Sequence, residues 1–256
     1  MNLPVMMAIS LFQLGNSILI IALLFLVFKI VESRWSYKIS KPYAWEEAVK
    51  NGEVSGKLKK IERFYRDKAR FYAIWFQIRR LKKDTVPGAF AELGVYQGET
   101  AKMIHEMAPD RSLHLFDTFE GFTREDLQNE SATNPNLGTD FSDTTAEQVK
   151  KFIDGNENIF LHAGHFPSTT ATCKEEKYAF VHLDADLYQP TLAGLMYFYP
   201  RLSPGGLILI HDYNHTWNGV TRAVDEFVKT IPEGRIDLMD WQGSVIIVKN
   251  KKTTND

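Results

Sequence analysis

The sequence predicts an α/β domain built on a mainly parallel sheet of seven strands, with an apolar helix and a basic amphipathic helix in front of it. Three observations support this fold class. The first 28 residues carry no charged side chain. Eleven Lys and Arg residues face only two acids, Glu62 and Asp67, between positions 57 and 83. From residue 85 onward, short apolar runs alternate with helical patterns, which is typical of βαβ units.

The composition is that of a globular protein. Hydrophobic residues make up 44% of the 256 positions and charged residues 24%, and the formal net charge is -2. This balance gives no indication of a nucleic-acid partner. The single cysteine, Cys173, excludes an intrachain disulfide and a cysteine-rich zinc site. We expect it to be a small packing residue.

Residues 1–40 are expected to form a membrane anchor and a juxtamembrane segment. Residues 9–31 are long enough to cross a hydrocarbon core of about 30 Å, and the run from Ile18 to Phe28 is unbroken. A cleaved signal peptide is the main alternative, but the segment lacks a basic n-region and a small-residue cleavage motif. Basic side chains follow the span and none precedes it, which predicts a single-pass protein with its remaining chain in the cytoplasm. These side chains are Lys29, Arg34, Lys38 and Lys41.

Residues 41–84 are expected to form a helical extension rich in basic and aromatic residues. Apolar side chains recur at helical spacing along 57–83, which predicts one amphipathic helix with a gap at Lys68. Three interpretations remain open. The helix lies on anionic lipid headgroups, its aromatic face caps the cleft of the next domain, or it is a solvated helix packed on that domain.

Residues 85–250 are expected to form the main domain, and 251–256 a polar tail. Two short, closely spaced strands at the end require a hairpin, so the pattern predicts an antiparallel strand at one edge of the sheet. The polar stretch 123–145 is too long for an ordinary connection and is predicted to be a lid or substrate loop. The predicted strands are 89–94, 112–117, 158–162, 178–184, 206–212, 236–240 and 243–249. The predicted helices are 98–108, 145–153, 190–201 and 217–230.

Ligands of parallel α/β sheets bind beyond the carboxyl ends of the strands. Five carboxylates at these positions are too many to be explained as helix caps alone. The residues at the predicted strand ends are Glu92, Gly94, Asp117, Gly164, Asp184, Asp186, His211 and Asp212.

The first strand–helix turn, Gly94-Val-Tyr-Gln-Gly98, allows close approach of the backbone to a ligand. It is not the dinucleotide fingerprint, because Tyr96 stands where G-x-G-x-x-G has its second glycine, and this argues against NAD. Asp117, after the second strand, is placed to accept hydrogen bonds from a ribose diol. Together they predict an adenosyl cofactor, and S-adenosylmethionine (SAM) fits.

Several motifs in the stretch 85–249 resemble the macrocin O-methyltransferase (TylF/MycF) family of class I SAM-dependent methyltransferases. The resemblance implies a Rossmann-like class I fold, SAM as methyl donor, a divalent cation and a sugar hydroxyl as acceptor. The motifs are Val86-Pro-Gly-Ala-Phe-Ala-Glu-Leu-Gly-Val-Tyr-Gln-Gly98, Leu115-Phe-Asp-Thr-Phe-Glu-Gly-Phe122, Gly164-His-Phe-Pro167, His182-Leu-Asp-Ala-Asp-Leu-Tyr188, Leu202-Ser-Pro-Gly-Gly206 and His211-Asp-Tyr213.

The resemblance also implies roles for individual residues. Asp184, His211 and Asp212 occupy the metal-ligand positions, with His211 replacing what is commonly an Asp. Asp186 matches the general base, and we expect a nearby cation to keep it ionised; His211 is the other catalytic candidate. The expected cofactor-binding residues are Glu92, Gly94, Tyr96, Gly98, Thr100, Asp117, Thr118, Phe119, Gly164, Phe166 and Asp184.

The identity of the metal and of the acceptor stays open. Mg²⁺ is the family's usual ion, whereas an imidazole ligand suits Mn²⁺ or another transition metal better. An anchored, cytoplasm-facing enzyme suggests a small-molecule or lipid-linked sugar, and the sequence leaves a homo-oligomer open. The alternatives are a metal-dependent methyltransferase of a phenolic or catechol-type acceptor, and a non-catalytic, membrane-tethered SAM-binding protein.

Overall fold

The computed structural model describes residues 3–36, 41–128, 130, 141–173 and 177–251. The chain divides into two compact units, Met1–Glu53 and Val54–Asp256. The helices α3 and α4, which precede the sheet in the sequence, belong to the second unit.

The first unit contains helix α1, Leu3–Ser36, and helix α2, Tyr43–Lys50. Within α1, the 22 residues Leu11–Glu32 have a mean hydropathy of 2.5 and no buried side chain. At about 1.5 Å per residue this stretch is about 33 Å long, enough for a bilayer core of about 30 Å. A signal sequence has the same length and composition. The membrane anchor therefore stays a prediction.

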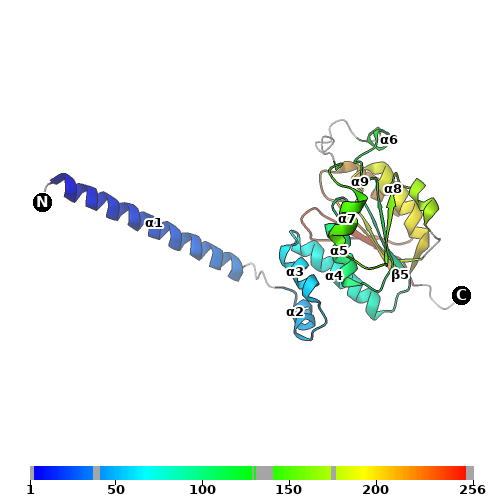
Figure 1. Cartoon of the computed structure of the whole chain (residues 1–256), viewed down its shortest axis with the longest axis horizontal. Coiled ribbons are helices and arrows are strands. Elements are labelled where there is room, and N and C mark those ends of the chain that lie inside the picture. Colours follow the sequence, from blue (N-terminus) through cyan, green and yellow to red (C-terminus); the bar gives the residue numbers. More distant parts are fainter. Residues whose placement is uncertain (1–2, 37–40, 129, 131–140, 174–176, 252–256) are drawn as a thin grey trace. The chain divides into compact units, whose positions relative to one another are not determined.

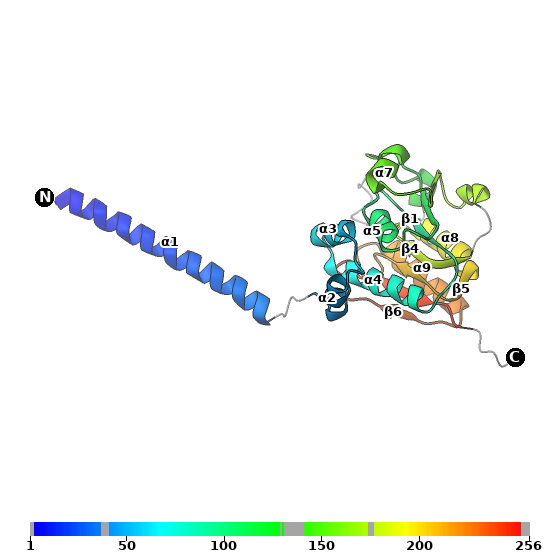
Figure 2. The ribbon, with the colours of Figure 1, turned by 60° about the horizontal axis from the view of Figure 1, so that its bottom comes forward.

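The second unit is built on a seven-stranded sheet with the order β3-β2-β1-β4-β5-β7-β6. Helices α4, α5 and α7 lie on one face of this sheet, and α8 and α9 on the other (Figures 1 and 2). The strand order reverses between β1 and β4, which is where open α/β sheets bind ligands. The strands are β1 Ala89–Leu93, β2 Leu113–Asp117, β3 Ile159–Ala163, β4 Tyr178–Leu183, β5 Leu202–Ile210, β6 Arg235–Asp237 and β7 Val245–Val248.

The predicted antiparallel edge strand is wrong in its position. Strand β7 is antiparallel to both β5 and β6, and it lies between them. The hairpin requirement holds, but β6 forms the edge. The three-residue β6 is exposed, whereas Val245, Ile246 and Ile247 of β7 are buried. The more apolar strand therefore takes the interior position.

The predicted single helix over 57–83 is also wrong, because the chain forms two helices there. Helix α3 covers Gly56–Phe64 and helix α4 covers Lys68–Lys83. The side chain of Asp67 accepts a hydrogen bond from the backbone N–H of Arg70 at 3.0 Å and so caps α4. An N-cap residue has an extended backbone, and this ends the helical path at the position where the sequence pattern showed its gap.

The remaining helices cover the two faces of the sheet. Along β1, Ala89, Ala91 and Leu93 face the core shared with α8 and α9, as alternation along a strand requires. Residues 129 and 131–140, about half of the predicted lid, lie outside the described residues, so its function stays a prediction. These helices are α5 Glu99–Met107, α6 Arg124–Leu127, α7 Ala146–Ile153, α8 Tyr188–Phe198 and α9 Asn218–Phe227, with 3₁₀ turns η1 Ser168–Thr172, η2 Tyr199–Arg201 and η3 Val228–Thr230.

The backbones after β1 and β4 approach each other closely at Gly94. Its φ is +85°, and an added Cβ atom would lie 1.9 Å from the carbonyl oxygen of Asp184. The N–H of Asp184 donates to the carbonyl of Leu93 at 2.8 Å, and the N–H of Gly94 donates to Phe116 at 2.9 Å. Only glycine fits this position.

We predict that Gly94→Ala destabilises the protein by roughly 2 kcal/mol more than Gly205→Ala, because only the first substitution forces backbone atoms to overlap. The two glycines have nearly the same φ, +85° and +81°. At Gly205 the added Cβ would meet the flexible end of Lys251 at 3.2 Å. Denaturant unfolding measures the difference; equal losses would show that the close approach costs nothing.

Candidate functional site

A cavity of about 460 Å³ opens at the carboxyl ends of β1, β2, β4 and β5. It gathers most of the predicted site residues from segments far apart in the sequence. Gly98 and Phe119 are not among its lining residues: Gly98 caps α5, and the N–H of Phe119 donates to Asp117. The predicted residues that line the cavity are Glu92, Gly94, Tyr96, Thr100, Asp117, Thr118, Gly164, Phe166, Asp184, Asp186, His211 and Asp212.

The carboxylate of Asp117 organises the loop after β1. Its Oδ2 accepts the backbone N–H groups of Val95 at 2.6 Å and Tyr96 at 2.9 Å. Its Oδ1 accepts the N–H of Phe119 at 2.7 Å. A carboxylate offers about four lone-pair sites, so capacity for a ligand hydroxyl remains. Asp117 therefore holds the glycine loop in shape and still faces the cavity.

His211 lies between two carboxylates at the end of β5. Its Nδ1 is 2.8 Å from Oδ1 of Asp184 and 3.0 Å from Oδ2 of Asp212. Burial alone would lower the pKa of His211, but the two carboxylates outweigh it and raise the pKa to about 10. Burial would likewise raise the pKa of Asp184, and His211 instead holds that pKa well below its ordinary value. The three groups form one coupled charge cluster.

Arg70 reaches this cluster from α4. Its Nη1 contacts Nε2 of His211 and lies 3.9 Å from Oδ2 of Asp184. A guanidinium has only donors, so this contact favours a ring whose Nε2 is an unprotonated acceptor. Arg70 thus opposes the second ring proton that Asp184 and Asp212 favour, and its charge lowers the pKa of His211.

Asp186 stands next to the cluster in a backbone conformation with φ of +58°. Burial and the neighbouring Asp184 and Asp212 raise its pKa well above the ordinary aspartate value. This direction differs from the expectation that Asp186 is held ionised by a cation. The carboxyl groups of Asp186 and Asp212 hydrogen-bond to each other and so share a proton readily. This prepares one of them to exchange a proton with a ligand.

The residues at this site fit a divalent cation in number and type. One donor atom each from Asp184, His211 and Asp212 lies within 4.8 Å of the others. Oxygen and imidazole donors together suit Mn²⁺, Fe²⁺ or Zn²⁺ as well as Mg²⁺. Binding through His211 Nδ1 requires that this nitrogen first loses its proton.

The basic segment lines the cavity at the start of α4, which bears on the interpretations that the sequence left open. Arg66 and Arg70 line the cavity, so basic side chains rather than an aromatic face contribute there. Sequence reasoning had not singled out these two arginines. The aromatic ring of Tyr65 supports Arg70 at 5.5 Å, and its hydroxyl hydrogen-bonds to Thr100 at 3.0 Å. Burial raises the pKa of Tyr65 to about 12. The run of basic residues was visible in the sequence, but which of them face the cavity depends on the break between α3 and α4 at Asp67.

Aromatic residues from three other segments complete the cavity wall. Phe122 packs edge-on against both Phe141 and Trp217, with ring centroids 5.2 and 5.9 Å apart. All three line the cavity, together with Gln242, whose amide donates to Asp212 at 3.2 Å. Their positions in loops gave no sequence signal, because no periodic pattern marks them.

Glu92 forms a buried pair with His182 on the neighbouring strand. Oε1 of Glu92 and Nδ1 of His182 lie 2.9 Å apart, and both side chains are almost fully buried. Burial raises the pKa of Glu92 and lowers the pKa of His182 to about 3. Both groups are therefore driven toward their uncharged forms. Oε2 of Glu92 has no hydrogen-bond partner among the described residues.

These features fit an adenosyl cofactor. The cavity volume lies in the range of small-ligand sites, roughly 300–1,000 Å³. Oε2 of Glu92, which has no hydrogen-bond partner among the described residues, belongs to a residue of the cavity wall and leaves a polar position for a ligand. Asp117 offers a carboxylate to a diol, and Gly94 lines the cavity with its backbone alone.

We predict opposite effects for two substitutions of Glu92. Glu92→Ala leaves Nδ1 of His182 buried without its partner and should cost about 1–3 kcal/mol of stability. Glu92→Gln keeps an oxygen acceptor and removes the ionisable group. A folded-state pKa above the ordinary 4.5 stabilises the protein at low pH, and this contribution is lost as pH rises. Glu92→Gln should therefore gain stability relative to wild type between about pH 5 and pH 7. Unfolding curves at several pH values measure this; a pH-independent difference would contradict it.

Comparison with known proteins places the chain in one family. The family model for macrocin O-methyltransferase (TylF) matches residues 66–245. The mycinamicin III 3''-O-methyltransferase of Micromonospora griseorubida is 30% identical over 145 residues, covering 51% of this chain and 57% of that protein. The 8-demethyl-8-(2,3-dimethoxy-alpha-L-rhamnosyl)-tetracenomycin-C 4'-O-methyltransferase of Streptomyces olivaceus is 27% identical over 142 residues, covering 51% and 54%. The matched region thus spans about half the length of these curated relatives.

Solved structures agree in fold. The O-methyltransferase NovP superposes with a TM-score of 0.60 at 23% identity, over 72% of this chain and 81% of that one. The calicheamicin methyltransferase CalS11 superposes with a TM-score of 0.57 at 19% identity, over 82% and 87%. The family model covers most of the chain, including α4, the strand-end carboxylates and the loop of Gly94. The chain belongs to the macrocin O-methyltransferase (TylF) family.

Proposed function

We propose that this protein is a membrane-tethered, SAM-dependent O-methyltransferase that methylates a hydroxyl group of a sugar or glycan precursor. The observation that carries the proposal is one cavity in a chain of this family. It combines the glycine loop and Asp117 with the carboxylate cluster of Asp184, Asp186 and Asp212. The glycine loop and Asp117 suit the methyl donor SAM, and the carboxylate cluster suits the hydroxyl group of an acceptor.

The donor half of the cavity is built from the segments after β1 and β2. Asp117 keeps the loop amides of Val95 and Tyr96 oriented and has capacity left for a ribose hydroxyl. Oε2 of Glu92 leaves a position for a hydrogen bond with a polar group of the ligand. Cofactor binding at this place would hold the methyl group at the switch point of the sheet, next to the carboxylates.

The acceptor half supplies a base. A sugar hydroxyl attacks the methyl carbon only while its proton is being removed, because its own pKa is far above neutrality. In the proposed step, the hydroxyl oxygen forms the new C–O bond, the C–S bond breaks, and the proton passes to Asp186. The electron pair of the broken bond stays on sulfur, which neutralises the sulfonium charge. A raised pKa makes the ionised form of Asp186 a stronger base.

A divalent cation at Asp184, His211 and Asp212 would hold vicinal hydroxyls and lower their pKa. The support for it is the donor set itself. Arg70 has a separate role in this proposal. It binds His211 and approaches Asp184, so it fixes the ring orientation and offsets part of the negative charge of the cluster.

The sugar acceptor is supported by the relatives, whose names include mycinamicin and rhamnosyl-tetracenomycin methyltransferases. A lipid-linked sugar is favoured by the apolar helix α1, which would keep the enzyme next to such a substrate. The basic residues that follow the span favour a cytoplasmic location for the catalytic unit.

We predict that the detergent-purified full chain transfers a methyl group from SAM to nucleotide-linked or lipid-linked sugars, read by mass spectrometry of the acceptor. Asp186→Asn should lower turnover roughly 10²–10⁴-fold, because the amide keeps the shape but cannot take the proton. SAM affinity, measured by calorimetry, should change little. Chelation by EDTA should abolish transfer and leave SAM binding intact.

The matched control is Asp154→Asn, which removes a carboxylate at the exposed end of α7 and should leave turnover unchanged. Transfer to catechols but not to sugars would replace the sugar acceptor with a phenolic one. SAM binding without transfer to either class would support a non-catalytic protein. Normal turnover of Asp186→Asn would assign the base to His211.

We predict that the full chain sediments with membranes and stays there after a carbonate wash, because an apolar span does not depend on charge screening. Ile20→Arg combined with Leu24→Arg should release it, since each Arg near the centre of a span costs about 2.5–3.5 kcal/mol. Lys59→Ala combined with Lys60→Ala, on exposed positions of α3, is the control and should stay bound. Release of the wild type by salt would leave only peripheral binding, and loss of the first residues from the mature chain would identify a signal sequence.

A further inference from the structure

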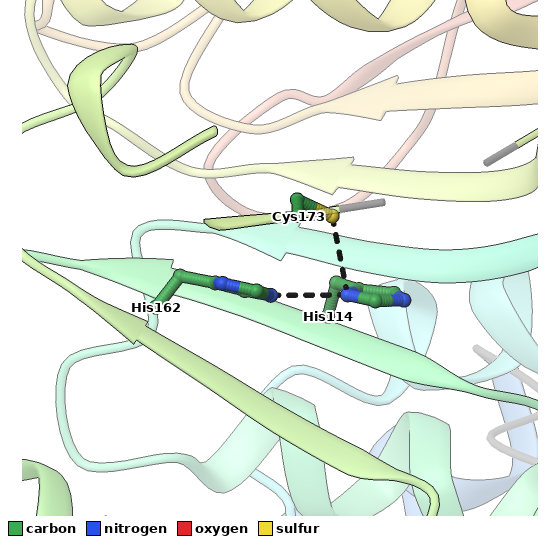
Figure 3. A group of neighbouring side chains, drawn as sticks. All are labelled: His114, His162 and Cys173. Atoms are coloured by element: carbon green, nitrogen blue, oxygen red, sulfur yellow. Dashed lines mark hydrogen bonds between the residues drawn. The ribbon is translucent and has the colours of Figure 1, made fainter. Parts of the chain in front are cut away.

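A second group of side chains with metal-ligand donor atoms comes from β2, β3 and the residue after η1, away from the proposed catalytic cluster. It consists of His114, His162 and Cys173, whose donor atoms all lie within 4.8 Å of one another. None of the three lines the cavity. Figure 3 shows the two rings extending from neighbouring strands, with the thiol of Cys173 above His114.

The distances within this group resemble those between two ligands of one tetrahedral zinc ion. His114 Nδ1 is 3.0 Å from His162 Nε2 and 3.5 Å from Cys173 Sγ. Bond lengths of about 2.05 Å to nitrogen and about 2.3 Å to sulfur give ligand separations of about 3.3 Å and about 3.6 Å at the tetrahedral angle. The two separations that involve His114 Nδ1 are therefore within a few tenths of an ångström of the tetrahedral values, and the third is within 4.8 Å.

The hydrogen bonds of the group also favour a shared cation. His114 Nδ1 has two neighbours, His162 Nε2 and Cys173 Sγ, and one ring nitrogen carries only one proton or one lone pair. The two contacts compete for the same atom. A cation placed among the three atoms would accept a lone pair from each of them and remove this competition.

Packing holds both imidazoles in place. His114 stacks on Phe160 with ring centroids 5.0 Å apart, and His162 stacks on Phe116 at 4.5 Å. On the far side of its ring, Nδ1 of His162 lies 3.2 Å from Oγ1 of Thr172, which can accept its proton and leave Nε2 as a ligand. Histidines that bind metals commonly donate their second nitrogen in this way.

We propose that His114, His162 and Cys173 form a structural zinc site. Two imidazoles and a thiolate suit zinc and disfavour Mg²⁺, which prefers oxygen ligands. On binding, the thiol of Cys173 releases one proton, and the proton of His114 moves to Nε2 so that Nδ1 can coordinate. A water or the hydroxyl of Tyr178, 3.5 Å from Sγ, would supply the fourth ligand.

Such a site would join three segments that border the cavity. Strand β3 continues into Gly164 and Phe166, both in the cavity wall, and Cys173 follows the turn η1. The zinc ion would fasten η1 to β2 and β3 and so fix the segment between them. Its role is independent of the proposed methyl transfer.

The test uses the full chain in detergent, stripped of metal by a chelator and then titrated with Co²⁺ and Zn²⁺. Wild type should show a thiolate-to-cobalt charge-transfer band and the intense visible bands of tetrahedral Co²⁺, both lost when Zn²⁺ displaces it. Cys173→Ser should lose the charge-transfer band and bind Zn²⁺ roughly 100-fold more weakly or worse, beyond the loss typical of removing an outer hydrogen-bond partner. In a chain that carries Asp184→Asn and Asp212→Asn, which removes the other donor set, zinc should raise the melting temperature, and it should not do so when Cys173→Ser is added.

The matched control is Asp184→Asn combined with Asp212→Asn, which disables the other donor set and should keep the charge-transfer band. X-ray absorption at the zinc edge of the wild type should show one sulfur neighbour at about 2.3 Å among nitrogen and oxygen neighbours at about 2.0 Å. This measurement decides the question even if a variant fails to fold. A zinc spectrum without sulfur, or equal Zn²⁺ affinity in wild type and Cys173→Ser, would overturn the proposal.

Discussion

The close contact between the ends of β1 and β4 is the constraint on which the site depends. Gly94 and Asp184 touch through their backbones, and the missing Cβ of Gly94 allows the contact. This contact brings the loop held by Asp117 next to the carboxylate cluster. With any side chain at position 94, the two halves of the cavity would be pushed apart. The proposed donor and acceptor sites are therefore neighbours because of a backbone fit.

The charge distribution around the cluster explains why basic residues precede the sheet. Asp184, Asp186 and Asp212 lie close together in a partly buried place, which is unfavourable without compensating cations. Arg70 supplies one from α4, and the ring of His211 bridges two of the acids. The helix before the sheet thus belongs to the electrostatics of the site. A domain that began at β1 would lack this positive charge.

The sequence predicted the parts of the fold that follow from periodic patterns. The βαβ alternation and the residues at the strand ends could be read directly, because strand ends of a parallel sheet converge at one edge. The grouping of Asp184, His211 and Asp212 as one set came from the family resemblance. The break between α3 and α4 could not, since it depends on one capping residue, Asp67, within a pattern that otherwise continues. The place of β7 between β5 and β6 also escaped prediction, because hairpin spacing defines which strands pair and leaves their order in the sheet open. The contacts of Arg70 and Trp217 with the cavity are tertiary and left no local signal.

The cap of α4 has a consequence for the order in which the chain acquires its structure. Oδ1 of Asp67 caps the helix, and Oδ2 accepts the backbone N–H of Trp241 at 2.9 Å, from a residue 174 positions later. A contact of such sequence separation forms only after the intervening chain has collapsed, because loop closure carries an entropic cost. During synthesis, the apolar N-terminal helix leaves the ribosome long before Trp241 exists. Helix α4, which carries Arg70, is therefore synthesised early, but its N-cap residue Asp67 acquires the contact with Trp241 late.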